Sequence, residues 1–537
     1  MSLRIRSIVL TVSLLPLGAA VAQRANPAAD LPQTRAERTQ YRETSRYDDV
    51  RAFLDVLARR DPRRVHLTQL GYTSETRAIP LAVVGAVADA TPEAVRRSGR
   101  TVVYIQANIH AGEVEGKEAV LVLLREIVQR RHESWLDSLV LLVVPVYNAD
   151  GTEHVSLTAR PFQNGPVGGT GQRANGQNLD LNRDHTKLES PEARAQAELW
   201  RRYDPHVAID LHTTDGSVHA YLLTYAEPLH PATDPALQRF VRETWLPWVA
   251  GAVKAQDGFD LFCYGNTPEE PVDRGGGGAE RGWYTFDHRP RFSENYWGLR
   301  NRLGILLETY SYASFEDRVR AMHATLVQTL AFAWAHAGEL RAMTAAADAR
   351  SVVGDSLAVR ARLRRGDSID ILLGAVTETR HPYTGQRMLV REDERRVERM
   401  PDYTTFEGAE WARVPRAYFV PAGLGAALER LAVHGIQVRR LAAPLVVALE
   451  RFRIDSTWTS PRVFQGHNER TLRGAWESAT DTLPVGTVVV DLTQPLARLA
   501  VILLDPRSDD GFLDWNLLDD ALAGARYYPV TRTSSPL

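Results

Sequence analysis

The sequence has very little cysteine and no marked excess of either charge. Cys263 is the single cysteine among 537 residues, so a disulfide within the chain and zinc sites built on Cys-x-x-Cys pairs are both excluded. The formal net charge is −2, which gives no indication of a nucleic-acid or anionic membrane partner. The sequence shows no internal repeat or heptad array, so repeat and coiled-coil architectures are not expected.

The N-terminus carries the pattern of an export signal. Arg4 and Arg6 precede the apolar run Ile8–Val21, and small residues lead up to Ala22. The run is short for a membrane anchor, and the sequence contains no later stretch that is long and apolar enough to span a bilayer. We therefore expect a signal peptide over residues 1–22, cleaved near Ala22, and an exported mature chain (periplasmic or secreted) with no membrane span.

Strands and helices alternate in the first two thirds of the chain. Strand-like runs at about 65–70, 79–84, 101–107, 139–146, 206–212 and 303–308 alternate with helix-like stretches at about 47–59, 114–131, 191–203 and 232–254. This order predicts an α/β fold, a mixed and mostly parallel sheet with helices on both faces. A long helix is expected over 324–350.

The chain of 537 residues exceeds one typical domain, and the pattern changes near residue 350. We expect a loose N-terminal segment at 23–44, a catalytic domain at 45–347, and a smaller α+β or β-rich accessory domain at 350–537. Strands are expected at 369–376, 411–420, 436–441, 445–454 and 487–492, and a helix at 422–434. His467 and the pair Asp509-Asp510 are isolated polar residues there, for which surface or turn positions are expected.

His110-Ala-Gly-Glu113 stands between the predicted strand 101–107 and the helix that follows it. Imidazole nitrogen and carboxylate oxygen are standard zinc ligands, and a His-x-x-Glu turn can aim both side chains at one point. The same four letters recur at His336-Ala-Gly-Glu339, inside the long predicted helix. That copy is interpreted as an ordinary solvated helix face, so the first copy needs partners elsewhere in the chain.

Two further strand ends supply those partners. His212 follows an apolar strand and completes a His-Glu-His set, which leaves the fourth zinc position open to water, as in catalytic sites. Glu308 ends another apolar strand, where a carboxylate is costly unless it is paired or used. Glu308 is therefore the candidate general base, although a salt bridge or a helix cap is the plainer interpretation.

Residues 178–184 lie between these strands and are rich in polar side chains. Asn182 and Arg183 are suited to gripping a carboxylate, because the arginine fork matches carboxylate geometry. Asp180 can accept a hydrogen bond from the nitrogen of a zinc histidine that does not bind the metal. Taken singly, each of these residues is as well explained by a polar network within a loop.

Together the motifs resemble those of the zinc carboxypeptidase family, the carboxypeptidase A-like metallopeptidases. The matches, spread over about residues 45–340, are His110-x-x-Glu113, Pro145-x-x-Asn148-x-Asp150-Gly151, Asp180-x-Asn182-Arg183, Glu192 with Arg194-Ala195, Asp210-Leu-His212 and Glu308. The resemblance implies a zinc carboxypeptidase-like fold and one zinc ion (Zn2+) per chain.

The resemblance also implies roles for individual residues. His110, Glu113 and His212 would bind zinc, and Glu308 would serve as the base and then as the proton donor to the leaving amine. Asn182 and Arg183 would hold the terminal carboxylate of a peptide substrate, and Asp180 would orient His110. The arginine that polarises the scissile carbonyl would be Arg173, with Arg160 as the second choice.

The sequence departs from the family pattern on the substrate side. Asp184 stands where the family has asparagine, and its negative charge close to Arg183 is expected to weaken or reshape carboxylate binding. The substrate-binding tyrosine of the family matches either Tyr284 or Tyr296. The physiological substrate and the oligomeric state stay open.

Three functions follow from these motifs. The first is a zinc metallocarboxypeptidase that hydrolyses the C-terminal peptide bond. The second is a zinc amidohydrolase that acts on cell-wall peptides or N-acyl amino acids. The third is a non-catalytic exported binding module, which a missing ligand or base would favour; the set is complete in this sequence.

Overall fold

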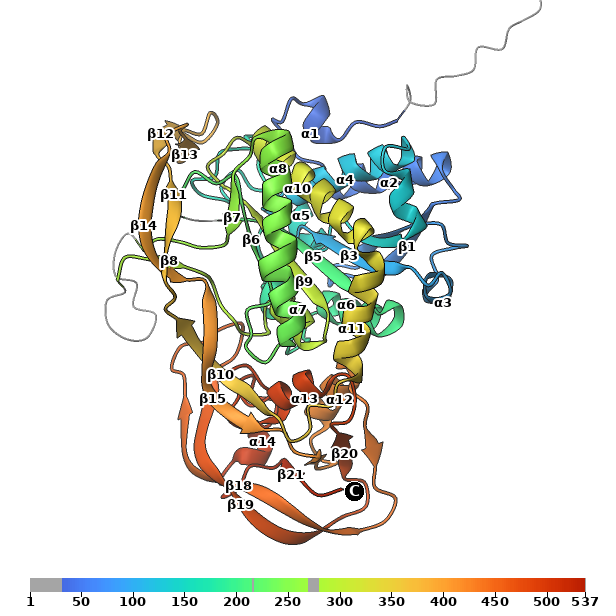
Figure 1. The fold of residues 1–537 in the computed structure, drawn as a ribbon, viewed down its shortest axis with the longest axis vertical. Coiled ribbons are helices and arrows are strands. Elements are labelled where there is room, and N and C mark those ends of the chain that lie inside the picture. Colours follow the sequence, from blue (N-terminus) through green and yellow to red (C-terminus); the bar gives the residue numbers. More distant parts are fainter. Residues whose placement is uncertain (1–30, 215–216, 269–279, 537) are drawn as a thin grey trace, which may run out of the picture.

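A computed structural model of the chain describes residues 31–214, 217–268 and 280–536, so the predicted signal peptide lies outside the described residues. Figure 1 shows an α/β region drawn mainly in blue to yellow and a β-rich C-terminal region in orange to red. Within the described ranges, no helix has the length and apolar character needed to cross a membrane.

The α/β region is built on one eight-stranded sheet. Its spatial order is β1 (Val65–Tyr72), β2 (Ala78–Val84), β4 (Leu139–Val144), β3 (Thr101–Ala107), β5 (Val207–Thr213), β9 (Leu303–Thr309), β6 (Leu223–Ala226) and β7 (Leu261–Cys263). Four of the seven neighbouring pairs are parallel, which confirms the predicted mixed, mostly parallel sheet.

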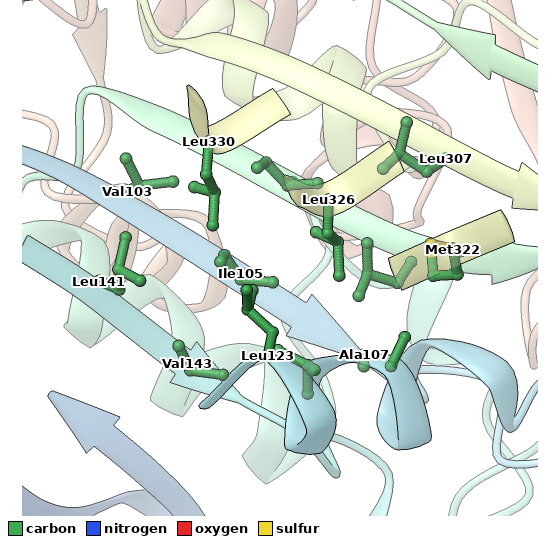
Figure 2. Close-up of a cluster of buried hydrophobic side chains, with 14 of the residues drawn as sticks. Val103, Ile105, Ala107, Leu123, Leu141, Val143, Leu307, Met322, Leu326 and Leu330 are labelled. Carbon is green, nitrogen blue, oxygen red and sulfur yellow. The ribbon is translucent and has the colours of Figure 1, made fainter. Parts of the chain in front are cut away.

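Helices cover both faces of this sheet because its central strands are apolar on both sides. On β3, Val103 and Ile105 face one hydrophobic cluster, whereas Val102 and Tyr104 face the other, as the two-residue period of a strand requires. Figure 2 shows the first cluster, in which Ile105 packs among side chains of the helices α4 and α10. The helices that contribute to the first cluster include α2 (Tyr47–Arg60), α4 (Glu115–Val128), α8 (Leu246–Asp257) and α10 (Phe315–Ala335).

The opposite face is covered by α6 (Pro191–Tyr203) and α9 (Ser293–Leu299). The remaining helices of the α/β region are α1 (Arg35–Arg38), α3 (Pro92–Arg97), α5 (Ala149–Glu153), α7 (Pro235–Phe240) and α11 (Ala337–Ala349). Three short helical turns of other types lie at Glu133–Asp137, Leu181–Arg183 and Val241–Trp245.

The long helix expected over 324–350 is two helices, so this prediction is wrong in its continuity. The first helix, α10, ends at Ala335, and α11 begins at Ala337. Between them His336 leaves helical geometry, with φ −108° and ψ 14°. The second His-Ala-Gly-Glu sequence therefore stands at a helix junction, where Nδ1 of His336 lies 2.8 Å from the Glu339 carboxylate and both side chains are well exposed.

The N-terminal segment predicted to be loose is ordered where the structure describes it. Two nitrogens of the Arg125 guanidinium on α4 donate to the carboxylate of Glu37 on α1, at 2.7 and 2.5 Å. Glu118, also on α4, accepts hydrogen bonds from the Thr44 hydroxyl and the Ser45 amide. These charge-assisted contacts attach residues 34–45 to the first layer of helices.

The C-terminal region is rich in strands, as predicted. A six-stranded sheet has the order β17 (Arg439–Arg440), β20 (Val488–Asp491), β16 (Ala417–Val420), β21 (Thr531–Thr533), β18 (Leu445–Thr459) and β19 (Arg470–Leu483). Smaller sheets pair β10 (Ser356–Arg364) with β15 (Thr405–Arg413), β12 (Val376–Arg380) with β13 (Arg387–Arg391), and β11 (Ser368–Leu373) with β14 (Arg396–Tyr403) and β8 (Trp283–Tyr284). Its helices are α12 (Gly425–His434), α13 (Ala497–Leu504) and α14 (Asp519–Leu522).

The two regions share one hydrophobic cluster. Trp297 of α9 and Tyr104 of β3 belong to the same group of buried side chains as Leu499 and Val501 of α13. Polar contacts reinforce this junction: Asp510, expected at the surface, is fully buried and accepts hydrogen bonds from Arg291. Of the surface or turn positions expected for Asp510, the surface position is wrong, because Arg291 pairs with its charge across the junction.

His467 links the β18–β19 hairpin to the α/β region. Nε2 of His467 lies 2.8 Å from the carboxylate of Glu189. The hydrogen bond to Glu189 raises the pKa of His467 above its usual value of 6.5, although burial opposes the shift. Burial opposes the change at Glu189 too, but hydrogen bonds from His467 and Lys187 lower its pKa from 4.5 to about 2.

This pair predicts a stability that depends on pH. The raised pKa of His467 means that its contribution is complete below pH 6.5 and is lost as pH rises through the folded-state value. The lowered pKa of Glu189 means that its contribution is complete above pH 4.5 and is lost towards pH 2. We expect His467→Gln to destabilise the protein most between pH 4.5 and 6.5 and less above neutrality, measured by urea unfolding. A destabilisation that stays constant from pH 5 to 9 would contradict this expectation.

Candidate functional site

Three side chains with metal-binding atoms meet where the parallel strands end. His110 and Glu113 stand in the turn between β3 and α4, and His212 is the sixth residue of β5. One ligand atom from each of the three lies within 4.8 Å of the other two, and all three side chains are buried. Adjacent parallel strands bring their carboxyl ends to one edge of the sheet, so residues 100 positions apart become neighbours.

The turn that carries His110 and Glu113 requires a glycine between them. A Cβ atom on Gly112 would lie 2.7 Å from Cγ of Arg160 and 3.0 Å from the carbonyl oxygen of Gly171. Those distances are too short for any side chain, so Gly112 allows the Arg160 side chain to approach the turn. The guanidinium of Arg160 then reaches Glu113, with Nη1 3.1 Å from Oε1.

Both histidines present the same nitrogen to the centre of the site. Nδ1 of His110 lies 3.0 Å from Oε1 of Glu113, and Nδ1 of His212 lies 2.9 Å from Oε2. The other nitrogen of each ring also faces a carboxylate: His110 Nε2 forms a hydrogen bond with Asp180 at 3.0 Å, and His212 Nε2 lies 2.9 Å from Asp210. This arrangement leaves two Nδ1 atoms and one carboxylate converging, and it suits zinc in donor type and in the carboxylates behind the rings.

Charge interactions keep the carboxylates of this site ionised. Burial would raise the pKa of Glu113, but His110 and Arg160 outweigh it and hold that pKa well below its usual value. The same balance holds for Asp180, whose pKa is well below the usual value because His110 and Arg183 outweigh its burial. Burial acts to lower the pKa of His212, but the Asp210 carboxylate raises it well above the ordinary value. The carboxylates that surround the two histidines are therefore ionised, and cationic side chains compensate their charge.

Glu308 lies beside the third histidine. It is the sixth residue of β9, and His212 is its partner in the parallel register of β5 and β9. Its side chain is partly buried, and its charge contributes to the raised pKa of His212. The structure thus brings Glu308 to the same edge of the sheet as the three metal-binding candidates.

The two candidate arginines, Arg160 and Arg173, differ in how much of the side chain is exposed. Arg160 uses Nη2 to donate to the carbonyl oxygens of Thr213 and Thr214, both at 2.9 Å, and its side chain is only 13% exposed. Arg173 donates through Nε to Asp180 at 2.9 Å, lies 3.6 Å from Glu113, and is 43% exposed. Arg173 therefore borders the site with more of its surface open, while Arg160 is held by the turn.

Asn182 and Arg183 form a short helical turn directly after Asp180. Oδ1 of Asn182 accepts from the Ser293 amide, and Nη1 of Arg183 donates to the Asn182 carbonyl oxygen. The Arg183 guanidinium carbon lies 3.8 Å from the centre of the Phe292 ring. Across residues 31–214, 217–268 and 280–536, no carboxylate forms an ion pair with Arg183, and the Asp180 and Asp287 carboxylates act on its charge only from a longer distance.

Asp184 was expected to weaken carboxylate binding by placing a negative charge close to Arg183, but its charge has another partner. Its side chain is fully buried and accepts hydrogen bonds from Lys187 and from the amides of Glu189 and Ser190. The negative charge is compensated by Lys187 at 2.8 Å, which leaves Arg183 available for an anion.

The two candidate tyrosines contact other parts of the molecule. Tyr296 is 1% exposed, and its hydroxyl bonds with Arg300 and His434. Tyr284 stacks on Tyr403 with ring centres 4.3 Å apart and donates to the Glu280 carbonyl oxygen. In this structure both hydroxyl groups therefore have partners outside the His110–Glu113–His212 cluster.

Asp210 and Ser293 are site residues whose roles the sequence reasoning missed. Ser293, the first residue of α9, donates through its hydroxyl to Asp210 and through its amide to Asn182. It therefore joins the support of His212 to the Asn182–Arg183 turn. For Asp210 a signal existed, because residues two apart on a strand share a face and His212 is two positions later. For Ser293 no local pattern pointed to the site.

Comparisons with known proteins find similarity to carboxypeptidases. The family model described as zinc carboxypeptidase matches residues 50–244. Carboxypeptidase 2 from Trichophyton rubrum is 22% identical over 514 residues, which cover 91% of this chain and 86% of that protein. Carboxypeptidase 2 from Trichophyton tonsurans is 22% identical over 455 residues, covering 80% of this chain and 76% of the relative.

The solved structures that match the chain include a carboxypeptidase A and a metallo-carboxypeptidase. The carboxypeptidase A from Helicoverpa armigera matches with a TM-score of 0.40 and 18% identity, over 57% of this chain and 75% of that chain. The metallo-carboxypeptidase from Burkholderia cenocepacia matches with a TM-score of 0.39 and 17% identity, over 54% of this chain and 69% of that chain.

Proposed function

We propose that the chain is a member of the zinc carboxypeptidase family, whose model matches residues 50–244, and that it is a metallocarboxypeptidase that removes the C-terminal residue of peptides. The observation that carries this proposal is the pairing of two features at one edge of the sheet. Two Nδ1 atoms and a carboxylate converge there, and Arg183, a cation with no ion pair in the described chain, lies on the turn that follows Asp180. A metal-binding cluster and an anion-binding cation are what hydrolysis next to a free carboxylate needs.

His110, Glu113 and His212 would hold one zinc ion, which supplies a Lewis acid and an activated water when it is bound. Glu308 takes a proton from the attacking water and delivers it to the leaving amine. Arg173 donates hydrogen bonds to the oxygen of the scissile carbonyl, where negative charge develops, with Arg160 as the alternative donor.

The remaining residues bind and orient. Arg183 and Asn182 hold the terminal carboxylate of the peptide, the arginine through its planar fork of donors. Asp180 and Asp210 hold the far nitrogens of His110 and His212 and so keep both Nδ1 atoms directed at the metal position.

The amidohydrolase and binding-module alternatives receive less support. Cleavage of an internal amide in a cell-wall peptide needs no cation for a terminal carboxylate, whereas Arg183 is available for one. An N-acyl amino acid also carries a free carboxylate, so Arg183 does not separate that substrate from a peptide with a free C-terminus. A binding module needs no proton acceptor beside the metal position, whereas Glu308 is paired in register with His212.

Arg183→Lys tests the exopeptidase assignment. Lysine keeps the charge but loses the bidentate fork, worth about 1.5–3 kcal/mol for hydrogen bonds to a charged group. We expect kcat/KM for peptides with a free C-terminus to fall on the order of 10–100-fold, at about tenfold per 1.4 kcal/mol. Cleavage is measured by mass spectrometry on matched free and amidated peptides, with the exposed Arg201→Lys as the control variant. Equal cleavage of free and amidated peptides by the wild-type protein would rule out a carboxypeptidase.

A further inference from the structure

One loop of the C-terminal region reaches the catalytic turn. Residues 460–469 connect β18 to β19 and lie outside the segment matched by the family model. At the tip of this loop, Oε1 of Gln465 accepts a hydrogen bond from the amide of Asp180 at 2.8 Å. Asp180 is the residue that holds His110, so a side chain 285 positions away contacts the support of a proposed zinc ligand.

The tip of the loop has a defined conformation. Phe464 and His467 exchange two backbone hydrogen bonds, at 2.8 and 2.9 Å, which close a tight turn around Gln465. Gln465 itself has φ +49°, in the left-handed region that residues other than glycine rarely adopt. His467 then fastens the turn to Glu189 at 2.8 Å and to Asn516 at 3.1 Å.

A second attachment joins the loop to the segment beneath Arg183. Nη2 of Arg291 donates to Glu469 at 2.7 Å, and the Arg291 guanidinium lies 5.2 Å from the centre of the Phe464 ring. Arg291 directly precedes Phe292, the ring that supports Arg183. The loop is therefore attached through Glu189 and Arg291, and Gln465 lies between two of the attached residues, Phe464 and His467.

Both carboxylate oxygens of Asp180 accept hydrogen bonds. Its Oδ1 accepts from Nε2 of His110 and from the Asn182 amide, and its Oδ2 accepts from Arg173. These partners belong to the catalytic segment itself. The C-terminal region contacts Asp180 through its main-chain amide, which donates to Gln465. This hydrogen bond sets the position of the Asp180 main chain.

We propose that Gln465 is a positioning residue, which fixes Asp180 so that its carboxylate meets His110 and keeps Nδ1 of that histidine directed at the metal. This inference rests on the proposed function, because it takes His110 as a zinc ligand. It assigns the 460–469 loop a part in the catalytic site. Residues that orient metal ligands from behind commonly change metal affinity about 10–100-fold when replaced.

The test compares variants of the full-length zinc-loaded protein. Gln465→Leu removes the acceptor at similar size, and Gln465→Glu keeps an acceptor oxygen. Gln494→Leu is the matched control, because Gln494 accepts from the Gln437 amide in the same region at 2.7 Å. Zinc release into excess chelator, kcat, KM and the melting temperature are measured for each protein, with Gln465→Ala as the replacement if the leucine variant does not fold.

We expect Gln465→Leu to release zinc about tenfold faster than the wild type and to lower kcat more than it raises KM. Gln465→Glu should stay within about twofold of the wild type in zinc release, because it keeps an oxygen that accepts from the Asp180 amide. Gln494→Leu should do the same, because it leaves Gln465 unchanged. Release by the leucine variant at the wild-type rate would overturn the proposal, as would equally fast release by the leucine and glutamate variants. A wild-type protein that holds no zinc would instead refute the proposed function on which this inference rests.

Discussion

Replacing Glu308 with glutamine is expected to lower kcat on the order of 10³-fold while the protein keeps its zinc. Glutamine has nearly the same shape but cannot accept a proton, and a positioned general base contributes on the order of 10²–10⁴-fold to the rate. Glu308 is not one of the three clustered metal-binding candidates, so its replacement leaves that set of donors intact. The loss should appear in kcat rather than in zinc content or folding.

The chain contains a matched control for this experiment. Glu339, in the second His-Ala-Gly-Glu sequence, is exposed at the junction of α10 and α11, so Glu339→Gln should leave kcat unchanged. Steady-state kinetics and zinc analysis by mass spectrometry are carried out on both variants. If zinc-loaded Glu308→Gln retains turnover within about tenfold of the wild type, below the usual contribution of a base, Glu308 is not the base.

Loss of the metal is expected to abolish activity and to lower the melting temperature. His212→Ala removes one of the three convergent donors, so we expect the variant to hold little zinc and to hydrolyse peptide at the background rate. The wild type treated with a chelator should behave in the same way, and added zinc should restore it. A metal that binds only the folded state stabilises that state by mass action, so the zinc-free protein should melt at a lower temperature.

His336→Ala provides the control for His212→Ala. Nδ1 of His336 also lies 2.8 Å from a glutamate three residues later, but no third ligand from another strand joins that pair in the described chain. We expect His336→Ala to keep full activity and zinc content, measured on the same protein preparations. Activity that survives both chelation and His212→Ala would exclude a metal-dependent mechanism.

The metal-binding candidates could be predicted from the sequence because they lie at or just after the ends of predicted strands. Apolar runs predicted β3, β5 and β9, and polar residues at their ends had to meet at one edge once the sheet was parallel. The two copies of His-Ala-Gly-Glu show that the letters alone are insufficient. Only the copy that follows a buried strand is joined by His212, and the other copy stands at a helix junction.

The substrate side was predicted less well because it depends on side-chain contacts between distant segments. Asp184 was expected to oppose Arg183, but its charge is compensated by Lys187 in a buried loop. Tyr284 and Tyr296 occupy plausible places in the sequence, yet the structure commits the first to Tyr403 and the second to His434. Local patterns do not encode such pairings, since they arise from the packing of separate elements.

By itself the sequence determined the α/β class, the strand ends and the residues available for metal chemistry, because hydrophobic periodicity and backbone direction are local properties. Tertiary structure alone decided which polar groups support them. Asp510 is buried beneath Arg291, and Gln465 reaches Asp180 from a hairpin 285 residues away. Burying a polar group is costly unless a partner is present, and only the folded chain brings these partners together.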